Sequence, residues 1–161
     1  MKLYHVVTAL VTGLSLAAGA ETWKVTPGTG VGPILLNQPC PAILKVLTPT
    51  DSIGMQGGGA YLRFKEGVEL EVQNQKVLQI VIHQLNFNAK SGPVDILLDG
   101  NLKMGAGLPQ VEGAYGRAYE SKAIPVAKGQ PPITYYAYKS RGLGVRTVGG
   151  KVVEYSVWAR H

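Results

Sequence analysis

Two side chains in this sequence have the chemistry of a nucleophile and a base. They are the thiol of Cys40, which is the only cysteine, and the imidazole of His83. A thiol becomes a catalytic nucleophile where a helix N-terminus or a neighbouring imidazole lowers its pKa. Cys40 stands between Pro39 and Pro41, which form a stiff entry to an expected short helix, and a small buried thiol suits that place equally well. We therefore assign no catalytic residue and expect a protein that is not an enzyme, with a small envelope enzyme using Cys40 or His83 as the alternative.

Ligands for a metal ion or a cofactor are few. His5 lies in an N-terminal segment that we expect to be removed, and His161 is the last residue. Asp95 and Asp99 project on one face of an expected strand without a third ligand nearby. A single cysteine excludes an internal disulfide and cysteine-rich zinc sites. The glycines of residues 28–32 lack the Lys-Ser/Thr that completes a phosphate loop. The sequence predicts neither a metal nor a cofactor.

Aromatic and basic residues alternate along three expected strands of the second half. On each of these strands we expect every second residue to face the core, which leaves the intervening side chains on the opposite face. The residues expected to face the core are Ile133, Tyr135, Ala137, Leu143, Val145, Val153, Tyr155 and Val157. Tyr, Trp and Arg are enriched at the energetic centres of interfaces. The alternative is that residues 120–132 cover this face as an inserted loop. The predicted binding residues are Tyr136, Tyr138, Arg146, Trp158 and Arg160.

The elements that position these residues recur along the chain. A shift of 75 residues brings 61–82 onto 136–157 without a gap, so that Tyr61 meets Tyr136 and Gly67 meets Gly142. Upstream the shift is about 60, which implies about fifteen additional residues in the second unit. Each unit reads as a strand, a short helix or irregular turn and three further strands, the last two joined by a tight turn.

Period-two alternation and an abundance of Gly and Pro favour antiparallel sheet over a helical bundle. A sheet with one buried face needs a cover, and the short helices are the available one. We expect an α+β fold, with one antiparallel sheet built from two related units and short helices covering one face. The chain should form a single domain over residues 21–161, with repeats at about 21–84 and 89–161.

The pattern of the repeats is similar to a known one. Its residues are Ile34, Leu36, Pro49, Tyr61, Gly67, Val68, Leu70, Lys76, Val77 and Ile80, with their partners in the second copy. In these positions the chain resembles the small repeats of exported bacterial proteins of the SmpA/OmlA and β-lactamase-inhibitor-protein-like superfamily. It departs from them at Asn37-Gln38, where Gly-Met is usual. The resemblance implies a non-enzymatic module that binds proteins or supports the envelope, and it transfers no functional residue.

The first twenty residues have the three parts of a secretory signal: a basic start, an apolar segment from 6 to 17 and the small residues Ala18-Gly19-Ala20. Ala20 stands where a lipid-modified cysteine would be needed, and no later segment is apolar enough to span a membrane. We therefore expect a signal peptide at 1–20 and a soluble mature chain, periplasmic or secreted.

Positive charge is concentrated in the second half. Residues 21–83 hold five basic and five acidic side chains, whereas residues 84–161 hold ten basic and five acidic ones. Such a surplus attracts anionic partners. The sequence predicts an exported binding module that docks an acidic protein or an anionic envelope polymer, with no sign of specific nucleic-acid binding.

Overall fold

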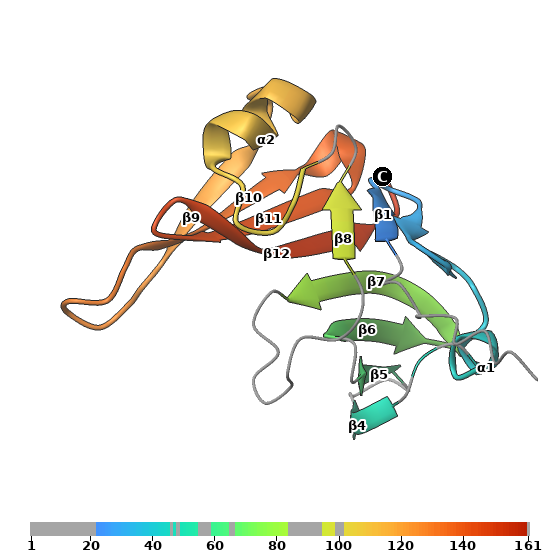
Figure 1. The fold of residues 1–161 in the computed structure, drawn as a ribbon. Coiled ribbons are helices and arrows are strands. Elements are labelled where there is room, and N and C mark those ends of the chain that lie inside the picture. Colours follow the sequence, from blue (N-terminus) through green and yellow to red (C-terminus); the bar gives the residue numbers. More distant parts are fainter. Residues whose placement is uncertain are drawn as a thin grey trace, which may run out of the picture.

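The computed structural model describes residues 22–45, 47, 49–54, 59–64, 67–83, 95–98 and 102–160, with the backbone alone for 95–98. Its main feature is an antiparallel sheet of eight strands (Figure 1). In spatial order these are β4 (Pro49–Gly54), β5 (Gly59–Phe64), β6 (Val68–Gln73), β7 (Lys76–His83), β12 (Lys151–Trp158), β11 (Leu143–Val148), β10 (Ile133–Tyr138) and β9 (Glu120–Ile124). The first half of the sheet is β4–β7 and the second half is β9–β12, and the two halves meet where β7 pairs with β12.

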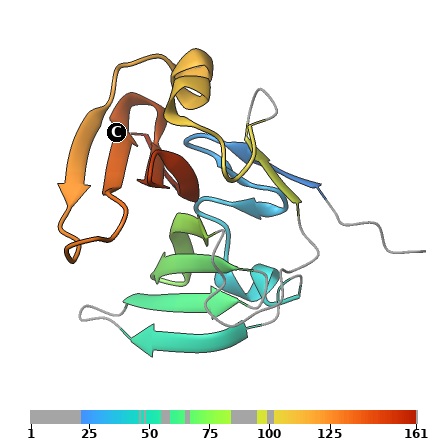
Figure 2. The same ribbon diagram turned by 60° about the vertical axis from the view of Figure 1, so that its left-hand side comes forward.

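A second, smaller sheet lies against the junction of the two halves (Figure 2). Its strands, in spatial order, are β3 (Ile34–Leu35), β2 (Gly30–Val31), β1 (Thr22–Thr26) and β8 (Asp95–Leu98). The helices are α1 (Cys40–Ile43), α2 (Leu108–Tyr115) and the single 3₁₀ turn η1 (Lys139–Arg141). Within the described part of the chain, no helix is long and apolar enough to cross a membrane.

The fold is mainly β, and the α+β prediction was wrong. The helix α1 has only four residues, too few to cover a sheet of eight strands. Most of the cover comes instead from the small sheet, whose first strand alternates buried Trp23 and Val25 with exposed neighbours. The strand at residues 22–26 was not predicted from this alternation. The helix of the second unit is longer, since α2 runs for eight residues and begins at a proline-containing first turn.

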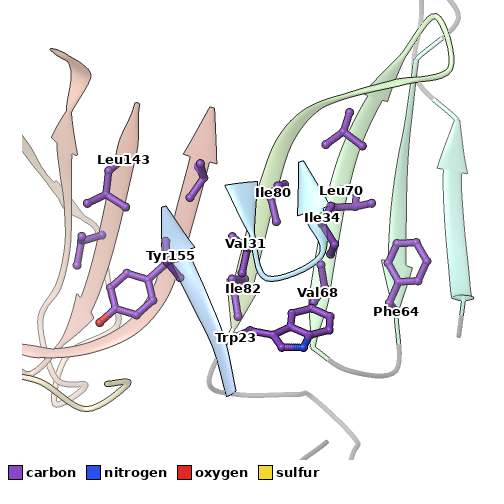
Figure 3. Close-up of a cluster of buried hydrophobic side chains, with 14 of the residues drawn as sticks. Trp23, Val31, Ile34, Phe64, Val68, Leu70, Ile80, Ile82, Leu143 and Tyr155 are labelled. Carbon is purple, nitrogen blue, oxygen red and sulfur yellow. The ribbon is translucent and has the colours of Figure 1, made fainter. Parts of the chain in front are cut away.

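The core lies between the two sheets (Figure 3). Trp23, Val31 and Ile34 of the small sheet pack toward Leu70 and Ile82 of the main sheet, and all five are buried. Burying one large aliphatic side chain stabilises a fold by about 1.5–3 kcal/mol. This core lies on one face of the main sheet, which we call the core face, and the opposite face is called the open face.

Local features recur 75 residues apart in the two halves of the main sheet. The hairpins β6–β7 and β11–β12 each contain a register shift, after Glu71 in the first and after Arg146 in the second. Each hairpin follows a glycine in the left-handed region, Gly67 or Gly142. The bulge and the left-handed glycine that precedes the hairpin are therefore the same in both.

The turn that precedes each hairpin differs in length by one residue. Residues 139–141 lie between Tyr138 and Gly142, whereas two residues separate Phe64 from Gly67. As a result Tyr138 occupies the position of Phe64, the buried last residue of β5, and the spacing along β10 is 74 rather than 75. A slip of one residue turns every side chain of a strand to the other face.

Candidate binding groove

The structure does not bring the five predicted residues onto one face. Tyr136 pairs with Val145, which pairs with the buried Tyr155, so Tyr136 lies on the core face. Tyr138 is also on the core face and only 1% exposed. The predicted facing of β10 was wrong: three residues separate β10 from Gly142 where two separate β5 from Gly67, and this places Tyr136 and Tyr138 on the core face. The predicted facing of β11 was correct.

Tyr136 and Tyr138 have a structural place beneath α2. Tyr119 makes edge-on ring contacts with both, at centroid distances of 5.0 and 5.3 Å, and its hydroxyl donates to the Glu112 carboxylate at 2.7 Å. Tyr115 of α2 meets Tyr138 edge-on at 5.9 Å. Edge-to-face pairs of this kind stabilise by about 0.5–1.5 kcal/mol each beyond their buried area. The tyrosine cluster therefore attaches α2 to the second half of the sheet.

Burial raises the pKa of Tyr138 from 10.0 to about 12. The unfolded chain loses this proton near pH 10 and the folded protein retains it longer, so stability falls as the pH rises from 10 toward 12. The buried hydroxyl has no hydrogen-bond partner among the described residues. We expect Tyr138→Phe to leave the urea midpoint at pH 7 unchanged and to reduce the loss of stability between pH 10 and 12. An identical alkaline loss in both proteins would contradict this assignment.

Trp158, Arg146 and Arg160 lie elsewhere. Trp158 and Arg146 are partly exposed on the face of the sheet opposite the core. Arg160 is exposed beyond the end of β12, where its side chain lies against Gly28 in the turn between β1 and β2. Two of the five predicted residues therefore remain on the open face, and the residue of β10 that joins them is Tyr135.

The open face is hollowed into a groove made of two adjoining hollows that share Gln79 and Tyr135. The Trp158 hollow, of about 720 Å³, is lined also by Ala137, Lys139, Ser140 and Trp158. The Glu154 hollow, of about 500 Å³, is lined by side chains from β5, β6, β7, β12, β11, β10 and β9. A single hollow with walls from seven neighbouring strands shows that this face of the sheet is concave.

Tyr135 is held in place in the centre of the groove. Its hydroxyl lies 3.1 Å from the Ser156 hydroxyl. The ring passes over Gly144, where a Cβ would lie 2.1 Å from the tyrosine oxygen. A glycine on the neighbouring strand thus provides the space for the ring, and the hydrogen bond fixes its direction. Because Tyr135 is fixed in advance, a ligand that contacts it loses little side-chain entropy.

A buried carboxylate forms the floor of the Glu154 hollow. Glu154 is directly opposite His83 on one side and Arg146 on the other. Its Oε2 lies 3.0 Å from His83 Nδ1 and 2.8 Å from an Arg146 terminal nitrogen, and its side chain is 5% exposed. An almost buried carboxylate needs such partners, because an isolated one would be strongly disfavoured.

The other acidic side chain of the Glu154 hollow is also paired. Glu69 accepts from Arg63 Nε at 2.9 Å. The lysines differ: Lys122 is exposed in the wall of the Glu154 hollow, and Lys139 at the Trp158 hollow forms an ion pair with the well-exposed Glu120. Exposed ion pairs of that kind contribute little, about 0–1 kcal/mol. The charge that the groove presents to solvent is therefore mainly positive.

Cys40 and His83 do not form a pair. The Cys40 backbone N–H donates to the Gln75 carbonyl beside the start of β7, and His83 ends that strand, about 23 Å farther along. Cys40 packs against the core, and burial raises the pKa of its thiol. A raised pKa reduces the thiolate fraction at neutral pH. Among the described residues there is also no group of three His, Cys, Asp or Glu side chains that would hold a metal ion.

Comparison with known proteins finds no matching family model, no matching curated protein and no matching solved structure. The groove must therefore be interpreted from its own residues. Sequence reasoning missed Tyr61, Gln79, Tyr135 and Ser156 as members of it. The signal that could have found Tyr135 was the additional residue between Tyr138 and Gly142.

Proposed function

We propose that this chain is an exported, non-enzymatic binding module that holds an anionic partner in the groove. The observation that supports this most strongly is the concave face itself, where partly exposed Trp158 and Tyr135 stand among charged and amide side chains. Aromatic side chains with polar tips supply large contact area at a small entropy cost. The N-terminal residues 1–20, which lie outside the described residues, support export by their signal-like composition.

The positions of the charged groups favour binding over catalysis. A general acid or base must be free to exchange a proton with a substrate. The two carboxylates that line the groove, Glu69 and Glu154, are each engaged with an arginine. The thiol of Cys40 is packed against the core on the other side of the sheet. The alternative, an enzyme based on Cys40 or His83, therefore has little geometric support.

The exposed cations favour an anionic partner. Lys122 stands at the Glu154 hollow and Lys139 at the Trp158 hollow, and the Arg146 side chain, which is paired with Glu154, is 41% exposed in the Glu154 hollow. A positive groove raises the local concentration of anions and accelerates their association at low ionic strength. The partner that we propose is an acidic protein or an anionic polymer of the cell envelope.

Trp158→Ala is expected to abolish capture of the partner. The mature chain, residues 21–161, is immobilised and exposed to envelope extract, and the bound material is compared between wild type and variant. Loss of one central aromatic contact weakens an interface by about 2 kcal/mol or more, which is at least thirty-fold. Raising the salt concentration should weaken the wild-type interaction as well.

Leu35→Ala is the matched control, since Leu35 is a half-exposed apolar residue of the small sheet, away from the groove. It should retain the captured partner at the wild-type level. If wild type, Trp158→Ala and Leu35→Ala all retain the same material, or none of them retains any, the proposed function is wrong.

A further inference from the structure

We infer that the groove is a saccharide-binding site, and that the anionic partner is an acidic polysaccharide with one sugar ring in the Trp158 hollow. This inference rests on the proposed function and names the chemistry of its partner. The Trp158 hollow is lined by two aromatic side chains, Trp158 and Tyr135, and by the small Ala137. Aromatic side chains in such a hollow can stack on a flat, rigid ring.

The surface of the hollow matches a pyranose in its chemistry. The face of an aromatic ring is the negative end of its quadrupole, and it attracts the polarised C–H groups of a sugar ring. Gln79 and Ser140 stand at the same hollow and offer donors and acceptors for hydroxyl groups. The remainder of its wall is largely apolar. A few polar groups on an otherwise apolar wall fix the orientation of a ligand without a large desolvation cost.

The shape of the site indicates a polymer rather than a single sugar. The two hollows are joined through Gln79 and Tyr135, so the groove continues from Trp158 past Tyr135 to the wall that contains Lys122. Both hollows are open to solvent along the sheet face. An extended chain can lie along such a groove and leave it at both ends, whereas a small metabolite would be only partly enclosed.

The distribution of charge indicates acidic sugars. The inward-facing acids are neutralised within the protein, because Glu154 contacts Arg146 and His83. Lys122 is exposed at the Glu154 hollow, and Lys139 at the Trp158 hollow is 68% exposed in an ion pair of 2.7 Å with the equally exposed Glu120, which a polyanion can replace. Carboxylates carried by the sugar rings of a polymer would reach both lysines. An ammonium binds such groups as a point charge and requires no fixed geometry, which suits a flexible polyanion.

The tryptophans allow a direct test. The chain has two, and Trp23 is only 3% exposed in the core, so a Trp23→Phe variant of the mature chain leaves the groove tryptophan as the single reporter. Its emission is titrated with tetragalacturonic acid, with the neutral cellotetraose and with pentaglutamate. We expect a saturable change with tetragalacturonic acid, binding about ten-fold weaker for cellotetraose, and no saturation with pentaglutamate.

Calorimetry on the variants then locates the site. Trp158→Ala should weaken tetragalacturonate binding by about thirty-fold, by the loss of the stacked ring. Lys122→Gln and Lys139→Gln should each weaken it about three-fold and reduce its salt dependence. Urea midpoints close to that of the wild type confirm that each variant is folded, and Lys45→Gln, at an exposed lysine beyond α1, is the matched control.

The opposite results overturn the inference. It is wrong if neither saccharide binds, if pentaglutamate or a proline-rich peptide binds as tightly as the acidic saccharide, or if binding is unaffected by Trp158→Ala. If the saccharides fail while a partner captured from envelope extract still depends on Trp158, the saccharide assignment fails and the proposed function stands. If that capture fails as well, both are wrong.

Discussion

Gly142→Ala is expected to lower the free energy of unfolding by about 3 kcal/mol or more, which would lower the melting temperature by roughly 10 °C. Gly142 has φ +64°, and an added Cβ would lie 2.2 Å from the Trp158 carbonyl oxygen and 2.9 Å from the Gly28 Cα. Both atoms belong to the backbone and cannot rotate away. The Gly142 carbonyl also accepts hydrogen bonds from the Trp158 and Gly28 N–H groups, so the strain would spread to β12 and to the turn after β1.

Gly150→Ala separates backbone strain from this steric conflict. Gly150 has φ +77° in the turn between β11 and β12, and an added Cβ there would meet no atom within 4 Å. The left-handed conformation alone costs a residue with a Cβ about 1–2 kcal/mol. Urea denaturation of both variants measures the difference. If Gly142→Ala lowers the free energy of unfolding by no more than Gly150→Ala does, the β12 backbone does not pack closely on Gly142.

Arg146→Met is expected to destabilise the fold by about 2–4 kcal/mol, and Glu154→Gln by about 1 kcal/mol. The asymmetry follows from burial. Removing the arginine leaves a carboxylate that is 5% exposed and, among the described residues, keeps His83 as its ion-pair partner, whereas removing the carboxylate leaves an arginine side chain that is 41% exposed and can turn to water. Urea denaturation at pH 7 gives both values.

The double variant Arg146→Met/Glu154→Gln tests the origin of this effect. Without the buried charge, loss of the arginine matters little, so the double variant should be more stable than Arg146→Met alone. The coupling free energy should be about 1–3 kcal/mol, as for side chains in direct contact. Two single effects that simply add would mean that the contact between these side chains contributes nothing to the fold.

The strands with clear alternation could be predicted from the sequence. The prediction that a tight turn joins the last two strands of each unit is confirmed by β6 and β7, which turn at residues 73–75, and by β11 and β12, which turn at Gly149-Gly150. Both turns use left-handed residues, Asn74 and Gln75 in the first and the two glycines in the second. These hairpins depend on local signals, period-two burial and turn chemistry, which a single sequence contains.

The cover of the sheet and its outer strands depended on long-range pairing. Residues 120–124 were read as part of an inserted loop, and they form β9 because β10 offers an edge to pair with. Their side chains are mostly exposed and carry little hydrophobic signal. The small sheet likewise depends on β8 pairing in parallel with β1, residues that are more than 70 positions apart. Such pairings leave no local pattern.

Part of the groove could be predicted from the sequence. Trp158 and Arg146 could be placed on the open face because their strands follow a regular hairpin. Tyr135 could not be placed there, because the facing of β10 depends on whether two or three residues separate the end of that strand from Gly142. The contact of Glu154 with His83 depends on β7 lying next to β12, a pairing that joins the two halves of the sheet and has no signature in either half alone.

The two outer strands of the main sheet have a consequence for the behaviour of the protein in solution. Among the described residues β4 and β9 each pair with a strand on one side only, so each presents a row of backbone groups that another chain can extend. β4 begins with Pro49, β9 carries Lys122 at its centre, and Pro125 follows its last residue. Proline and lysine at such positions oppose the addition of a further strand. Lys122 therefore opposes edge-to-edge aggregation, in addition to any role in ligand binding.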